Sequence, residues 1–183
     1  MTTLIWQGIF YQSLEYFNLL SEDKNYTAES KIIGCHEDKI YALEYRILTD
    51  KNWVVQSFSI ESEINTLKRI FTGKRNQDQW EINGTINPDF NNFKFIDISL
   101  TPFTNTLPIN NLKLSENIPQ KIDVMYIDIL NHRIWPVQQQ YTRTTANTYL
   151  YENIENDFKA EISVDGNGLV TSYPELFEKI AGL

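Results

Sequence analysis

The 183-residue sequence contains one cysteine, Cys35, and two histidines. A single cysteine excludes an internal disulfide and is typical of a reducing compartment, so we expect a cytoplasmic protein. A zinc site needs three or four well-spaced nitrogen or sulfur ligands. The run Cys35–Asp38 ("CHED") does not provide them, because consecutive residues of a strand point to opposite faces. We interpret this run as a polar turn, and we expect neither a metal nor a cofactor.

Positive charge is also scarce, with 16 lysines and arginines against 24 acidic residues and a formal net charge of -8. An acidic surface repels phosphate backbones, so nucleic acid is not an expected partner. The sequence has no apolar run of about 18 residues, which is the minimum for a membrane-spanning helix. Its N-terminal segment lacks the basic and apolar regions of a signal peptide, so we expect no secretion by that route.

Glycine and proline are few, with seven and six residues. This composition argues against a disordered or fibrous chain. The hydrophobic fraction of 42% and the aromatic fraction of 13% are sufficient for a sizeable core. The length predicts one domain over residues 1–183.

Alternation of apolar and polar residues is the dominant pattern in the chain. In residues 41–47 the apolar side chains fall on the odd positions, and in residues 158–164 they fall on the even positions. A period of two is the signature of half-buried strands. Short polar connections between such segments favour antiparallel neighbours. The strongest turn signal is Asp165–Gly168 ("DGNG"), which predicts a hairpin.

A single segment has a clear helical pattern. Pro174 suits the first turn of a helix, Glu175 suits its positive end, and Gly182 suits its end. We therefore predict a short C-terminal helix, and a second short helix or turn is an alternative for Glu15–Leu20. The predicted fold class is mostly β, with one domain and one short C-terminal helix.

The stretch Thr101–Leu112 ("TPFTNTLPINNL") is not an ordinary strand. Pro102 and Pro108 donate no backbone hydrogen bond, so the sheet must break or bend there. The residues before them, Thr101 and Leu107, are expected to be extended. The small polar residues between the prolines can bond to the backbone. These features favour a corner in the fold over a ligand contact.

Asp97 is the most distinctive acidic residue, because Phe93 and Phe95 precede it on the same face of a predicted strand. A carboxylate on an aromatic face is costly unless it is hydrogen-bonded. A structural role, a ligand anchor and a glycosidase acid are all compatible with this position. A hydrolase would need a second carboxylate, for which Glu44 and Asp165 are candidates.

Aromatic residues are numerous, with four tryptophans, ten tyrosines and ten phenylalanines. Tyr149 and Tyr151 fall on one face of a predicted strand. Rows of aromatic side chains line a sugar or lipid groove in some proteins and fill the core in others. The sequence leaves both interpretations open.

Residues 95–114 ("FIDISLTPFTNTLPINNLKL") resemble the signature of the putative glycolipid-binding family of bacterial proteins. The segments "IWQGIFYQSLEY", "YRILTDKNW", "WEINGT", "QQQYTR", "YLYE" and "VDGNGLV" resemble further elements of that family in the same order. The resemblance implies a long antiparallel sheet rolled into a spiral β-roll or open barrel around a helix. That shape is similar to periplasmic carriers of lipoproteins and lipids.

The chain departs from the family pattern after Pro108. The family usually has Ile-Arg-Arg-Leu there, whereas this sequence has Ile109, Asn110, Asn111 and Leu112. If the arginines contact an anionic head group, that contact is lost. The departure favours a neutral sugar, a plain lipid or a structural role for the segment.

The leading hypothesis is a non-enzymatic protein that binds an amphipathic small molecule, a glycolipid or lipid, in the groove of the rolled sheet. A small glycoside or ester hydrolase that uses Asp97, and a ligand-free protein-interaction module, are the alternatives. The expected apolar walls are Trp6, Tyr45, Trp53 and Trp80, and the expected polar contacts are Arg46, Asp97, Asn105, Gln140 and Tyr141.

Overall fold

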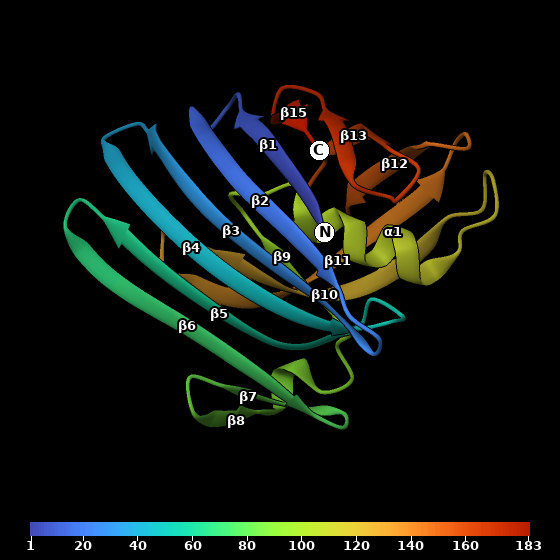
Figure 1. Ribbon diagram of the computed structural model, residues 1–183. Helices are drawn as coiled ribbons and strands as arrows, with labels where there is room; N and C mark the ends of the chain where they lie inside the picture. The colour runs from blue at the N-terminus through green and yellow to red at the C-terminus, as the bar shows by residue number, and fades with distance from the viewer.

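Alternating residues build most of the chain into one curved sheet of 15 strands (Figure 1). The computed structural model describes residues 1–183. The first half of the chain forms β1 (Thr2–Gly8), β2 (Ser13–Ser21), β3 (Asn25–His36), β4 (Lys39–Asp50), β5 (Val55–Ile64), β6 (Leu67–Asn76), β7 (Gln79–Ile82) and β8 (Thr85–Asn87). The second half forms β9 (Phe95–Ile98), β10 (Gln120–Asp128), β11 (Arg133–Arg143), β12 (Thr148–Asn153), β13 (Lys159–Val164), β14 (Val170–Tyr173) and β15 (Phe177–Gly182).

The strands follow the order β8-β7-β6-β5-β4-β3-β2-β1-β15-β14-β13-β12-β11-β10-β9. Hairpins therefore build each half, and the first and last strands of the chain join the halves. All neighbours are antiparallel except β9 and β10, which are parallel. The predicted antiparallel sheet is thus mixed at one edge. A parallel pair needs a crossover connection, and here that connection contains the helix.

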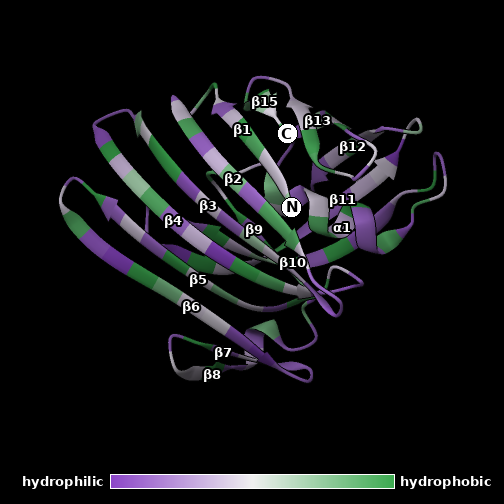
Figure 2. Cartoon of the chain, viewed as in Figure 1, coloured by the Kyte–Doolittle hydropathy of each residue, from purple (hydrophilic) through white to green (hydrophobic).

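The sheet rolls into a spiral without closing. Burial alternates along β2 and β4, as expected when one face of the sheet is buried and the other is exposed. Figure 2 shows hydrophobic and hydrophilic residues interspersed along β2 to β6. On β9 both faces are buried, since Phe95 and Ile96 point in opposite directions and each is inaccessible. The edge of the sheet therefore lies inside the roll. Phe71 on β6 stacks on His132 of the β10–β11 turn, with ring centroids 4.2 Å apart.

The only α-helix lies in the proline-rich segment, within the concave side of the roll (Figure 1). A short 3-10 helix, η2 (Phe103–Asn105), leads into α1 (Thr106–Leu112), and the buried Phe103 and Leu107 anchor the pair. The predicted extended geometry at Leu107 is wrong. Pro108 is tolerated at the third helical position because the first backbone N–H groups of a helix have no acceptor within it.

α1 is short and ends where Lys113 adopts a left-handed conformation with φ of 47°. Neither α1, with seven residues, nor any 3-10 helix combines the length and hydrophobicity of a membrane span.

The predicted C-terminal helix is wrong. Tyr173–Leu176 forms a turn, with Glu175 at a φ of 65°, and Phe177–Gly182 is the strand β15. β15 pairs with β1 along most of its length, and this pairing overrides the local helical pattern. Glu15–Leu20, for which a helix or turn was an alternative, belongs to strand β2.

Two turn predictions are confirmed. Asp165–Gly168 joins β13 to β14, and Gly168 has the positive φ of 75° that favours glycine. Cys35 and His36 end β3, and Glu37 and Asp38 form the turn to β4.

Candidate functional site

A cavity of about 610 Å³ opens at one end of the roll's interior. The segment that carries the two prolines forms part of its floor, through Thr101 and Asn105. Asp97 on β9 completes this polar floor. The turn β1–β2, the loop β12–β13 and the turn β14–β15 supply the exposed residues of the rim. Thr101–Leu112 is thus both an internal plug and a cavity wall.

Asp97 is fixed by two neutral donors. Thr104 Oγ1 donates to its Oδ1 at 2.9 Å, and Gln139 Nε2 donates to its Oδ2 at 2.6 Å. Its side chain keeps some accessible surface toward the cavity. Burial raises the pKa of Asp97, and the hydrogen bonds from Thr104 and Gln139 oppose that rise. No ion pair compensates this carboxyl group, so its charged form is costly.

Asn105 is held in place from below. Its Nδ2 donates to the carbonyl oxygen of Pro102 at 3.2 Å, and its Oδ1 accepts a hydrogen bond from the Tyr141 hydroxyl at 2.7 Å. Tyr141 is inaccessible, so it supports Asn105 and does not line the cavity. Such support from a second residue fixes the orientation of a polar group that faces a ligand.

Aromatic side chains form most of the cavity wall. Two exposed phenylalanines, Phe10 (54% exposed) and Phe158 (41% exposed), stand at the rim. Deeper in the cavity lie Tyr11, Tyr126, Trp135, Tyr151, Tyr173 and Phe177.

The hydroxyl groups of Tyr11, Tyr126, Tyr151 and Tyr173 make no hydrogen bond within the protein, and none is a sealed polar atom. Each is therefore free to bond to a ligand in the cavity. Burial raises the pKa of all four phenols, Tyr11 to about 12, and the negative charge of Asp97 contributes to the rise in each. These hydroxyls are neutral near pH 7, so they both donate and accept hydrogen bonds.

A second buried carboxyl group lies behind Thr101. Oε1 of Glu15 accepts hydrogen bonds from Ser30 (2.7 Å), Tyr45 (2.8 Å) and Thr101 (2.9 Å), whereas its Oε2 is buried without a partner. Burial raises the pKa of Glu15 to about 7, although the three hydroxyl donors oppose the rise. This group is sealed from the cavity and has a structural role.

Most of the predicted apolar walls lie in the core. The indole nitrogen of Trp6 donates to the carbonyl oxygen of Val170 at 2.7 Å, and that of Trp80 donates to the carbonyl oxygen of Phe93 at 2.9 Å. Both tryptophans are inaccessible, and Tyr45 belongs to the Glu15 cluster.

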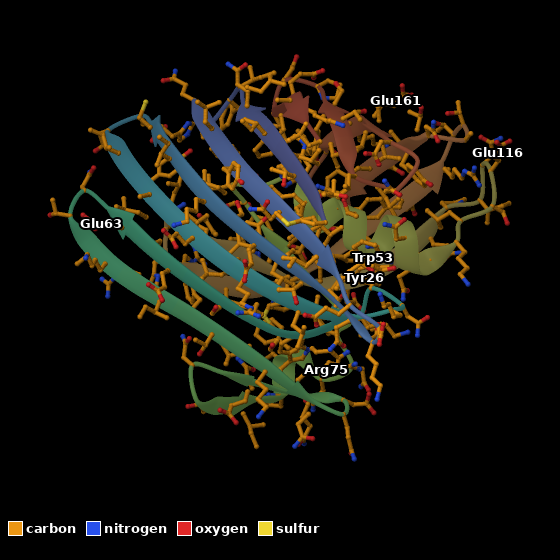
Figure 3. All side chains as sticks on the ribbon, in the orientation of Figure 1. Tyr26, Trp53, Glu63, Arg75, Glu116 and Glu161 are labelled. Carbon is orange, nitrogen blue, oxygen red and sulfur yellow. The ribbon has the colours of Figure 1, made fainter.

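Trp53 lies outside the cavity, beside the β4–β5 turn. Its ring stacks on Tyr26 at 4.3 Å, with the Lys51 ammonium 4.2 Å from the Tyr26 ring (Figure 3).

Two predicted polar contacts face away from the cavity. Arg46 lies on the outer face of β4, 3.5 Å from Glu29. Gln140 lies on the face of β11 opposite the inward-facing Gln139 and Tyr141, and it donates to Glu152. Of the predicted set, the structure brings together Asp97 and Asn105 at the cavity floor, with Tyr141 beneath them.

The carboxylates considered as hydrolase partners of Asp97 are not near it. Glu44 is on the outer face of β4 and pairs with Lys31 at 3.1 Å. Asp165 caps its own turn by accepting from the backbone N–H groups of Asn167 and Leu169. Neither residue lines the cavity, so these acid–base pairs are not assembled.

Sequence reasoning missed most of the phenol groups. Tyr126 and Tyr173 come from β10 and β14, which are far apart in sequence, and only the roll brings them together. A signal existed for Tyr151, which shares an inward face with Tyr149, as predicted. Alternation along β10 and β12 predicts which side chains point into the roll. It does not predict which of those side chains border a cavity.

Two further hollows lie on the outer face of the sheet. One, of about 1110 Å³, is bordered by the exposed side chains of Ile33 (63% exposed) and Ile40 (73% exposed). The other, of about 340 Å³, is bordered mainly by charged and polar residues, Arg46 among them. Both lack the converging buried polar groups of the interior cavity, so the interior cavity is the candidate site.

The fold and the cavity define an open β-roll with a polar-floored, aromatic-walled site. The chain belongs to the putative glycolipid-binding family, whose pattern matches residues 3–179. It is similar to a crystal structure of a DUF1089 family protein from Pseudomonas aeruginosa, with 34% sequence identity and a TM-score of 0.82. That similarity covers 91% of this chain and 92% of the other. A comparison with curated proteins gave no match.

Proposed function

We propose that this protein binds a glycolipid-like amphiphile, with the polar head group in the interior cavity and the apolar chain at the rim. The observation that carries the proposal is the meeting of aromatic walls, free phenol hydroxyls and a fixed polar floor in one cavity. Its volume of about 610 Å³ suits a small ligand. Membership of a family described as putative glycolipid-binding supports the same class of ligand.

The chemistry of the walls fits a hydroxyl-rich head group. An aromatic ring presents a flat apolar face against which the C–H face of a sugar packs. The four free phenols and Asn105 then meet the ring hydroxyls with donors and acceptors. Phe10 and Phe158 at the rim offer apolar surface to the first methylenes of a chain, each worth about 0.8 kcal/mol when buried.

The first experiment is native mass spectrometry of gently purified protein, followed by organic extraction of anything released. A stoichiometric glycolipid would establish the ligand class directly. A calorimetric titration with octyl glucoside then gives the affinity for a defined probe.

The location of the site is tested with the double variant Tyr151→Phe and Tyr173→Phe. Neither hydroxyl has a protein partner, so the fold should keep its stability. Loss of two hydrogen bonds, each about 0.5–1.5 kcal/mol, should weaken octyl glucoside binding about tenfold. Tyr16→Phe, on the outer face, is the matched control and should bind like the wild type. Unchanged affinity in the double variant would move the site elsewhere, and absence of all binding would support the ligand-free alternative.

A further inference from the structure

The cavity has a strongly one-sided charge. Asp97 and Asp128 lie on its wall, and Glu155 and Glu175 stand at its rim. Of the 16 lysines and arginines, none lines it. Of the hydrogen bonds, ion pairs and cation–π contacts that lysine and arginine side chains make, only the cation–π contact of Arg133 involves a lining residue, Trp135. The Arg133 side chain itself is exposed to solvent. The interior therefore holds acceptors and negative charge without a counter-cation.

The charges of the carboxylates act on the phenol groups that share the cavity wall. After burial, which is the largest cause, Asp128 and Asp97 raise the pKa of Tyr11 and Tyr126, and Asp97 raises those of Tyr151 and Tyr173. Negative potential that disfavours a phenolate at four points favours a cation in the space between them. The cavity is lined by eight aromatic side chains, and the quadrupole of an aromatic ring attracts an ammonium group to the ring face.

Asp97 provides a further reason for a positive ligand. Its two hydrogen bonds come from neutral groups, and no protein cation compensates it. A ligand ammonium group in the cavity would supply the missing counter-charge. An anionic head group at the same place would be repelled by the carboxylates.

We propose that the head group accepted by the cavity carries a positive charge, as a protonated amine on a hydroxyl-rich ring such as an amino sugar. This inference rests on the proposed function and narrows its ligand class. It follows from the four carboxylates and the aromatic walls that surround a cavity bordered by no lysine or arginine. An anionic head group is disfavoured by the same surroundings.

The test compares three probes that share one alkyl chain and one sugar ring: octyl glucosaminide, octyl glucoside and octyl glucuronide. The measurements are made by calorimetry below micelle-forming concentrations, at about pH 6, where an amine of this kind is protonated. We expect the amine to bind about tenfold more tightly than the neutral glycoside, and the glucuronide about tenfold more weakly. Raised salt should reduce both differences.

The rim carboxylates provide the decisive variant. Glu155 and Glu175 are exposed, so the double change Glu155→Gln and Glu175→Gln should fold normally and reduce the preference for the amine to about threefold. The control is Glu116→Gln with Glu161→Gln, which removes the same charge at two exposed positions that do not line the cavity. Figure 3 labels both residues. This control should keep the tenfold preference.

The outcomes separate the two proposals. Equal binding of the amine and the neutral glycoside would overturn the cationic preference and leave the glycolipid proposal standing. Equal loss of preference in the rim variant and its control would also overturn it, because the effect would then come from net charge alone. Absence of binding by all three probes would overturn the proposed function itself.

Discussion

Two carboxyl groups inside the roll differ in their hydrogen-bond partners and in their access to the cavity. Glu15 is sealed, with three hydroxyl donors on one oxygen and none on the other. Asp97 has one donor on each oxygen and keeps access to the cavity. The same short segment serves both, since Thr101 donates to Glu15 and Thr104 donates to Asp97. The comparison separates a carboxyl group that stabilises the fold from one placed where a ligand can reach it.

The largest expected effect is the loss of stability when Glu15 or Asp97 is replaced by alanine. Glu15→Ala leaves a cavity and three buried hydroxyls without their acceptor, so we expect a loss of about 4 kcal/mol in the free energy of unfolding. Asp97→Ala should cost about 2 kcal/mol, because water in the cavity can hydrate Thr104 and Gln139. Urea unfolding measures both values. Equal losses would show that access to the cavity does not distinguish the sites.

The next effect is a pH dependence that belongs to Glu15. Its pKa rises from the ordinary value of 4.5 to about 7 on folding, so the folded state holds the proton more tightly. The stabilisation is complete below about pH 4.5 and falls as the pH rises to about 7, by about 3 kcal/mol.

Glu15→Gln removes this titration while keeping an acceptor for the three hydroxyls. Urea unfolding between pH 5 and pH 8 should therefore show a flatter stability profile for the variant, which overtakes the wild type at the higher pH. Parallel profiles for the two proteins would assign the slope to another group.

The smallest effect compares the two threonines of the shared segment. Thr101→Val removes one of the three donors to Glu15, and we expect a loss of about 2 kcal/mol that grows as Glu15 ionises. Thr104→Val removes a donor to Asp97 and the acceptor of the Ile98 N–H, and we expect a loss of about 2 kcal/mol that does not grow as Glu15 ionises. Thermal unfolding at two pH values distinguishes them. A pH-dependent loss at Thr104 instead of Thr101 would reverse the assignment.

The strands were the predictable part of this protein. Period-two alternation correctly predicted β4 and β13, and "DGNG" correctly predicted the hairpin after β13. Two local patterns were misleading. Residues 174–182 have a local pattern that is typical of a helix, but pairing with β1 makes them a turn and a strand. Thr106–Leu112 contains a proline and two asparagines, yet it forms the helix because burial of Leu107 and Ile109 stabilises it.

The site was predictable only in its floor. Asp97 stood out because a carboxylate followed aromatic residues on one face, and Asn105 because it lay in a segment unfit for a strand. Of the three tryptophans predicted as walls, Trp6 and Trp80 are core residues bonded to backbone carbonyls, and Trp53 stacks on Tyr26 outside the cavity. Alternation shows which side chains point inward, but it does not show where the roll's interior remains open. That depends on how far the spiral turns and on what α1 fills.

The pairing of β1 with β15 has a consequence for how the chain folds. The strands of the first half pair with sequence neighbours, so their hairpins need only local contacts. The seam between Leu4 and Gly182 joins β1 to β15, which all the other strands separate in sequence, so it can form only after β15 has been synthesised. Contacts of such long sequence separation slow folding, and the uncovered edge of β1 is prone to wrong pairing meanwhile. Completion of this seam is therefore the expected rate-limiting event, and a chain truncated before β15 should aggregate instead of forming the roll.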